Sequence, residues 1–206
     1  MRAHGLLVVL AVWAAGCSTR LDPPRSAGPA PRPAAAPPAT TAARTVTLSA
    51  ENTRVTFIGS AGGTSHEGTF DRLSGTWELP TDDPKDSRLA VRIEVDSLRT
   101  RIGLLTMHLK RSDFLDAKQC PTAAFQATRI EPEPGPGGTT HRVTGEFTIH
   151  GVTRSVTFPA KLVVGPDLAS LEATFPVSQT AFGMAAGAEK ARDEVPVTVV
   201  INAPGQ

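Results

Sequence analysis

Apolar and polar residues alternate along much of this chain. In residues 88–96 the odd positions are aliphatic and most of the even positions are charged. A period of two places successive side chains on opposite faces of a β-strand, so this segment is predicted to be a strand with one buried face. The same alternation predicts eight strands, at residues 53–60, 66–79, 88–96, 122–130, 141–150, 153–164, 168–178 and 194–202.

Two places interrupt this regular pattern. In the second segment Phe70 is out of phase with Leu73, so both face the interior only if the strand has a bulge near Asp71 and Arg72. Between the third and fourth strands, leucine and isoleucine recur at helical spacing. We therefore predict a short helix over residues 100–110, which would cover one end of the sheet.

The order of the predicted elements restricts the fold class. Turn-forming segments rich in Pro, Gly and Asp separate the strands, and no helix repeats between them, which excludes a parallel α/β fold. The alternation leaves open a β-sandwich and a closed antiparallel up-and-down barrel. A barrel of about eight strands is the size that can hold one small apolar ligand.

The first 44 residues differ in composition from the rest. Residues 1–17 combine an early Arg2, a ten-residue apolar run and small residues before Cys17, the pattern of a bacterial lipoprotein signal peptide whose cysteine is acylated. The alternative is an ordinary secretory peptide in which Cys17 has no role. Residues 18–44 are rich in Pro and Ala and are predicted to be a disordered tether ahead of a folded domain at 45–206.

Charge and cysteine content exclude several classes of protein. The whole chain has 21 Lys and Arg against 20 Asp and Glu, and residues 45–206 keep 16 of the former and 19 of the latter. Such a domain has no basic field for nucleic acid. With Cys17 acylated, Cys120 has no partner for a disulfide and is predicted to be a packed, inert thiol.

Four short segments resemble the YceI-like family. Residues 108–116 read HLKRSDFLD and are followed by CPTAAF, residues 143–153 read VTGEFTIHGVT, residues 180–184 read TAFGM, and residues 193–195 read DEV. The resemblance covers residues 46–203 in the family's order. Cys120 stands where the family usually has Tyr, and Leu115 where it has a second Phe.

The resemblance implies an all-β fold: an eight-stranded antiparallel up-and-down, lipocalin-like barrel with the short helix between strands 3 and 4. Family members are secreted or periplasmic, and their known ligands are polyisoprenoids such as a polyprenyl pyrophosphate or a quinone tail. We therefore expect an envelope lipid carrier, anchored through Cys17 and facing the periplasm, most simply from the outer membrane. It would need no cofactor beyond the bound lipid, and the sequence leaves its oligomeric state, a dimer included, open.

The predicted ligand-binding residues are apolar residues on the inward phase of the strands, with two from the irregular segments. They are Phe57, Phe70, Trp77, Val91, Ile93, Phe114, Phe125, Phe147, Ile149, Phe158, Leu171, Phe175, Phe182, Val197 and Val199. Several inward positions are small, which fits an open lumen better than a solid core; these are Ala123, Ala127, Ala160, Ala169 and Ala173. A solid core of a non-binding barrel would use the same inward phase.

Two polar residues are candidates for contact with a lipid head group. His108 and Arg111 lie near the end of the predicted helix, where they could meet a pyrophosphate or a quinone ring. In the alternative, His108 bonds only to backbone groups and Arg111 pairs with Asp113. The histidines are spread over separate elements, so no metal site is predicted.

Two other functions compete with the carrier. A ligand-free barrel could dock another envelope protein through its loops, and an enzyme could act on a lipid head group through His108 and Asp113. No nucleophile elbow, P-loop or dinucleotide fingerprint is present in the sequence, so we expect no catalysis.

Overall fold

Eleven strands form one antiparallel sheet in the computed structural model, which describes residues 44–61, 63–80, 87–165, 167–185 and 193–204. The strands are β1 (Arg44–Ser49), β2 (Thr53–Ala61), β3 (Thr64–Phe70), β4 (Leu73–Leu79), β5 (Arg88–Glu94), β6 (Leu98–Thr100), β7 (Thr122–Pro132), β8 (His141–Ile149), β9 (Val152–Val164), β10 (Leu168–Ser178) and β11 (Glu194–Pro204). The helical elements are η2 (Val95–Ser97), α1 (Gly103–Leu109), η3 (Pro136–Gly138) and η4 (Thr180–Phe182).

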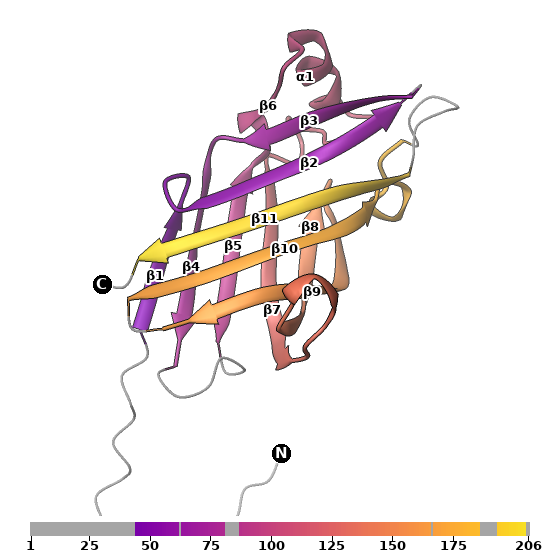
Figure 1. Cartoon of the computed structure of the whole chain (residues 1–206). Coiled ribbons are helices and arrows are strands. Elements are labelled where there is room, and N and C mark those ends of the chain that lie inside the picture. The colour runs from indigo at the N-terminus through magenta and orange to yellow at the C-terminus, as the bar shows by residue number, and fades with distance from the viewer. Residues whose placement is uncertain (1–43, 62, 81–86, 166, 186–192, 205–206) are drawn as a thin grey trace, which may run out of the picture. The chain divides into compact units, whose positions relative to one another are not determined.

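The sheet is strongly curved and forms a half-barrel (Figure 1). Its strand order is β1-β4-β5-β7-β8-β9-β10-β11-β2-β3-β6. Because β3 leads into β4 through only Asp71 and Arg72, strands near opposite ends of this order are joined along the chain. From β7 to β11 each strand pairs with the next in sequence, as expected for an up-and-down arrangement.

The predicted all-β antiparallel class is confirmed, but the eight predicted strands are eleven in the structure. The sequence pattern missed β1, which has only two buried apolar positions, Val46 and Leu48. It missed the three-residue β6, and where a bulge was expected near Asp71 and Arg72 the predicted second strand is instead broken into β3 and β4, which pair with different strands.

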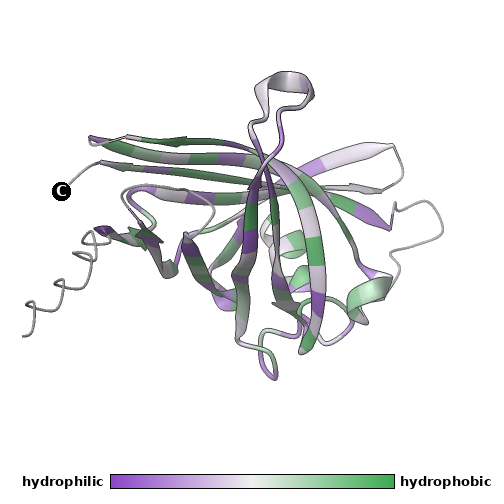
Figure 2. Ribbon diagram, turned by 90° about the horizontal axis from the view of Figure 1, so that it is seen from below, coloured by the Kyte–Doolittle hydropathy of each residue, from purple (hydrophilic) through white to green (hydrophobic). Residues whose placement is uncertain are grey.

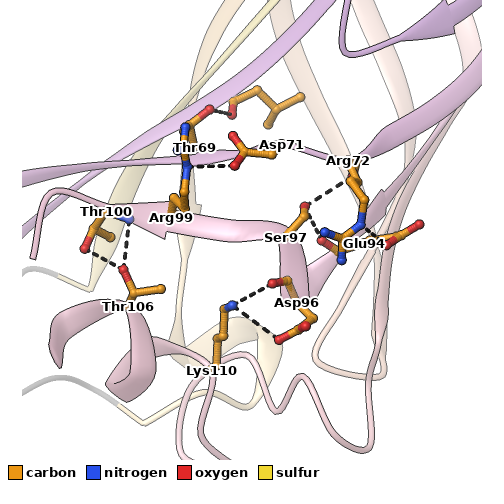
Figure 3. Close-up of polar contacts among 11 residues, drawn as sticks. Thr69, Asp71, Arg72, Glu94, Asp96, Ser97, Arg99, Thr100, Thr106 and Lys110 are labelled. Carbon is orange, nitrogen blue, oxygen red and sulfur yellow. Dashed lines mark hydrogen bonds and ion pairs between the residues drawn. The ribbon is translucent and has the colours of Figure 1, made fainter. Parts of the chain in front are cut away.

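Exposed ion pairs link Asp71 and Arg72, the two residues between β3 and β4, to the neighbouring strands β6 and β5 (Figure 3). Asp71 pairs with Arg99 at 2.7 Å, and Arg72 pairs with Glu94 at 2.5 Å. The Ser97 hydroxyl donates to the Glu94 carbonyl at 2.6 Å. Each exposed pair contributes only about 0–1 kcal/mol of stability. The bend is therefore stabilised mainly by the backbone pairing of β3 with β6 and of β4 with β5.

The single described α-helix, α1, is seven residues long and shorter than the predicted 100–110. It stands on β6: the Thr106 hydroxyl accepts from the Thr100 N–H at 2.9 Å (Figure 3). Beyond its C-terminus, the Lys110 ammonium donates to the Asp96 carbonyl at 2.5 Å and pairs with the Asp96 carboxylate at 3.2 Å. None of the helix residues is buried.

Apolar residues alternate with polar ones along the strands, as Figure 2 shows, and the inner face of the half-barrel is apolar. We call the end where β1 begins and where η3 joins β7 to β8 the β1 end, and the opposite end, which carries α1, the α1 end. The β1 end is tightly filled by Trp77, Leu79, Ile130 and Val143, each at most 2% exposed. The α1 end contains a cavity.

Candidate ligand-binding cavity

An apolar cavity of about 130 Å³ lies inside the half-barrel. The inner faces of β2, β3, β5, β7, β8, β9, β10 and β11 line it, together with the last residue of α1, the N-cap of η4 and segments that follow α1 and η4. Among the described lining residues only Gln179 is polar. Such a site offers burial to an apolar guest and almost no hydrogen-bonding partner, so it selects for hydrocarbon.

Thirteen of the fifteen predicted ligand-binding residues line this cavity. They are Phe57, Phe70, Val91, Ile93, Phe114, Phe125, Phe147, Ile149, Phe158, Leu171, Phe175, Val197 and Val199. Strand alternation therefore located the lining correctly, while contact with a ligand stays a prediction.

Trp77 and Phe182 do not line the cavity. Trp77 is fully buried opposite Val46 and Leu89 and packs in the filled β1 end, although its partner Leu89 does line the cavity. Phe182 is buried in η4, where its ring lies 5.4 Å from that of Phe147 and supports the lining from behind. For Trp77 the inward phase was correct but the expected place in the lining was not, and Phe182 belongs to η4 rather than to a strand.

The predicted ligand-binding residues omitted ten that line the cavity, of which Ala123 was predicted only as a small inward residue: Val55, Leu89, Leu109, Leu115, Ala123, Val177, Gln179, Met184, Val195 and Ile201. Those on strands share the phase of predicted neighbours and could have been found. Leu109, Leu115 and Met184 come from segments without period two, and only their hydrophobicity marked them. Of the five small inward residues, only Ala123 lines the cavity; Ala160, Ala169 and Ala173 are instead buried among other side chains.

A row of phenylalanines crosses the lining. The rings of Phe158 and Phe175 stack with centroids 4.2 Å apart, and Phe125 lies 5.6 Å from Phe158. The three residues belong to β9, β10 and β7, which lie within four successive strands of the sheet. Stacking of this kind adds about 0.5–1.5 kcal/mol per pair to the burial of the rings, which makes the row a firm wall.

A histidine ties down the segments that cover the α1 end. His150 and Gly151 form a two-residue turn between β8 and β9, with φ values of 51° and 73°. This places the His150 ring between the segment after α1 and η4: its Nε2 lies 3.2 Å from the Ser112 carbonyl oxygen and its Nδ1 lies 3.2 Å from that of Phe182. The two covering segments are thus linked through one side chain.

The cover is reinforced by direct backbone contacts. The Ala185 N–H donates to the Asp113 carbonyl at 2.7 Å, and the Arg154 guanidinium donates to the Ala181 carbonyl. The segments at 108–116, 143–153 and 180–184, which carry the resemblance described above, therefore meet at the α1 end of the cavity.

An aspartate fixes the start of η4. The Asp193 carboxylate accepts from the Ser178 hydroxyl at 2.6 Å and from the Thr180 N–H at 2.8 Å. These hydrogen bonds favour the charged form, first through Ser178 and then through Thr180, and hold the pKa of Asp193 below its usual value.

The two head-group candidates lie beside the cavity but outside it. His108 and Arg111 are exposed, and the His108 ring lies 4.7 Å from that of Phe114, which lines the cavity together with Leu109. A head group that protruded from the α1 end would therefore find an imidazole and a guanidinium within reach.

Other chemistry finds no support in the described part of the chain. No group of three or more His, Cys, Asp or Glu side chains there could hold a metal ion. Cys120 is half-buried and forms no disulfide there. Among the described helices, none has the length and hydrophobicity to cross a membrane.

A curved antiparallel sheet around an apolar cavity is a lipocalin-type fold. The chain belongs to the YceI-like domain family, whose model matches residues 46–203. This confirms the resemblance carried by the short segments.

Relatives with known sequences match part of the chain. A UPF0312 protein of Pseudomonas putida strain F1 is 36% identical over 93 residues, which is 45% of this chain and 47% of that protein. A UPF0312 protein of Pseudomonas aeruginosa strain LESB58 is 31% identical over 96 residues, 47% of this chain and 48% of that protein. The chain thus spans about half the length of the curated relatives it matches.

Solved structures share the fold. BcnA of Burkholderia cenocepacia has a TM-score of 0.66 and 23% identity, and the match covers 73% of this chain and 96% of BcnA. A polyisoprenoid-binding domain from Saccharophagus degradans has a TM-score of 0.60 and 14% identity, covering 79% of this chain and 98% of that domain.

Proposed function

We propose that this protein binds a polyisoprenoid, such as a polyprenyl phosphate or a quinone tail, and carries or sequesters it in the bacterial cell envelope. The observation that carries the proposal is the cavity, which is lined by hydrocarbon and almost free of polar groups. The similarity to a polyisoprenoid-binding domain supports this choice of ligand class. The activity is binding, not catalysis.

The size of the cavity limits how a long chain enters. A cavity of about 150 Å³ lined by aliphatic and aromatic residues holds a benzene-sized guest. The present 130 Å³ therefore accommodates the end of a prenyl chain as it stands. Deeper entry requires the row of Phe125, Phe158 and Phe175 to move, and burial of about 25 cal/mol per Å² of prenyl surface supplies the driving force.

The polar end of the lipid is proposed to lie at the α1 end. There His108 and Arg111 would contact a phosphate or a quinone oxygen, while the β1 end is closed by packed side chains. The proposed arrangement in the cell is attachment through acylated Cys17, with residues 18–44 as a spacer and the domain facing the periplasm from the outer membrane. Cys17 and most of the spacer lie outside the described residues.

Mass spectrometry of bound lipid tests the proposal. The full chain is purified from a bacterial envelope, extracted with organic solvent, and compared with Ala123→Leu, which fills the cavity, and with Ala90→Leu on the exposed outer face of β5. A prenyl lipid is expected in the wild type and in Ala90→Leu, and a several-fold smaller amount in Ala123→Leu. A chain that is empty on isolation and takes up no prenyl lipid in vitro would refute the function.

Attachment is tested separately by metabolic labelling. Radioactive palmitate is expected to label the full chain, and Cys17→Ser is expected to abolish the label. Labelling that persists in Cys17→Ser would show that the acylated residue lies elsewhere.

A further inference from the structure

We propose that the tip formed by residues 101–111, which contains α1, docks on the surface of an anionic lipid bilayer. Three large apolar side chains are exposed there: Leu104 at 73%, Met107 at 62% and Ile102 at 46%. They gather on one short helix and its N-cap, and no residue of this helix is fully buried, although Leu109 at its end packs against the core. Apolar side chains grouped in this way on a protruding element are typical of a surface that another phase or molecule covers.

The charge around these side chains identifies an anionic partner. Residues 97–112 contain Arg99, Arg101, Lys110 and Arg111 but no Asp or Glu, whereas residues 45–206 as a whole have more acidic than basic residues. Arg99 and Lys110 are engaged by Asp71 and Asp96, as Figure 3 shows. Arg101, His108 and Arg111 are exposed on the tip itself. Apolar side chains rimmed by cations are the pattern of helices that lie in the interface of an anionic membrane.

The position of the tip links docking to the cavity, and this step rests on the proposed function. In Figure 1, α1 projects beyond the strands at the end of the molecule opposite the start of β1. The helix ends at Leu109, which lines the cavity, and so does Phe114 a few residues later. Docking through the tip therefore places the covered end of the cavity against the bilayer, where a prenyl chain could pass between lipid and protein without crossing water.

A second exposed apolar group serves as a matched control. Val163, Val164 and Leu168 flank the turn between β9 and β10, with exposures of 36–46%. The Arg44 guanidinium donates to the Gly165 carbonyl of this turn at 3.2 Å, so the group belongs to the β1 end. It also consists of three apolar side chains, less exposed than those of the tip, but it is not surrounded by a run of cations without acids, since Asp167 lies within it.

The test is a fluorescent probe that reports only its own surroundings. In the full chain carrying Cys17→Ser and Cys120→Ser, a nitrobenzoxadiazole probe is attached at Met107→Cys or, as the control, at Val163→Cys. Vesicles of phosphatidylglycerol are expected to brighten and blue-shift the probe at 107 and to leave the probe at 163 unchanged. Vesicles of phosphatidylcholine are expected to bind the tip several-fold more weakly.

Two substitutions separate the apolar and charged contributions. Leu104→Ser is expected to weaken the partitioning of the tip at least about tenfold, since it removes a leucine from the interface. Arg101→Gln is expected to weaken it about fivefold, the effect of one cation near an anionic surface.

The results that would overturn docking are distinct from those that would overturn the proposed function. A probe at 107 that ignores vesicles or responds as the probe at 163 does excludes docking by the tip, and equal binding to both vesicle types excludes its proposed selection of an anionic bilayer. The vesicles contain no prenyl lipid, so an empty cavity leaves the assay intact. A tip that docks in a chain that never captures a prenyl lipid would refute the carrier function alone.

Discussion

The β1 end and the α1 end of the half-barrel are built from the same alternating strands but are filled in different ways. At the β1 end, the side chains of Trp77 and Leu48 pack in the interior and are at most 1% exposed. At the α1 end, Val197 and Val199 leave space, and β11 is only partly buried there. Side-chain size at each level, rather than the fold, decides where the interior is solid.

This difference separates stability from function within one domain. Close packing gains dispersion and hydrophobic energy from each filled volume, whereas a cavity forfeits it. The β1 end is therefore expected to supply most of the free energy of folding, and the α1 end to give up part of it for room. Substitutions at matched positions of the two ends can break or confirm this division.

The largest effect is expected from Trp77→Ala. Removal of a fully buried indole from the filled end should lower the free energy of unfolding by about 3–5 kcal/mol, measured by urea denaturation. The indole Nε1 has no hydrogen-bond partner among the described residues, so Trp77→Phe should cost much less than Trp77→Ala. A loss below about 1 kcal/mol for Trp77→Ala would mean that the β1 end is not the stable part.

Two leucines compare the filled interior with the cavity lining. Leu48 is 1% exposed and does not line the cavity, whereas Leu171 is 3% exposed and does. We expect Leu48→Ala to cost about 3–5 kcal/mol and Leu171→Ala about 2–3 kcal/mol, because a side chain beside a cavity has fewer contacts to lose. Equal costs, measured by the same denaturation, would contradict the division.

Replacing an alanine by leucine should reduce stability in the filled interior but reduce lipid binding in the cavity lining. Ala160 is fully buried and does not line the cavity, so Ala160→Leu should destabilise the protein by about 1–3 kcal/mol through overpacking. Ala123 lines the cavity, so Ala123→Leu should change the thermal midpoint little while reducing lipid capture. A strong destabilisation by Ala123→Leu would show that the lining cannot adapt to added volume.

The sequence predicted the strands well because period two is a local signal. The strand that contains Val91 and Ile93, and the face on which they lie, can be predicted from apolar neighbours two residues away. The count of strands was less accessible, since β6 has only three residues and β1 only two buried apolar positions. These short strands form only because β6 pairs with β3 and β1 pairs with β4, and the paired residues are far apart in the sequence.

The alternation of apolar and polar residues does not predict whether an inward residue lies in the filled interior or lines the cavity. Trp77 and Val91 both face inward, yet one lies in the filled end and the other lines the cavity. Register alone does not explain the difference, because β5 pairs Leu89, which lines the cavity, with Trp77, which does not; the packing of long-range neighbours around the indole decides it. The part of the site formed by Leu115 and Met184 depends on the cover held by His150, and no periodic pattern encodes that cover.

The smallest effect concerns the cover of the α1 end and its dependence on pH. Hydrogen bonds from Ser178 and Thr180 hold the pKa of Asp193 below the ordinary value of 3.8. A carboxyl whose folded pKa is depressed adds stability that is present above its unfolded pKa and is lost as the pH falls through the folded one. We therefore expect Asp193→Asn to lower the thermal midpoint at pH 7 and to converge with the wild type as the pH is taken below about 3.8.

Thermal melts of the two chains between neutral and acidic pH measure this convergence, with Asp167→Asn in the exposed turn after β9 as the control. The control should follow the wild type at every pH. A gap between Asp193→Asn and the wild type that stays constant down to the lowest pH would show that the carboxylate's charge does not hold η4. The cover of the cavity would then depend on the uncharged contacts of η4, and its opening would be insensitive to the ionisation of Asp193.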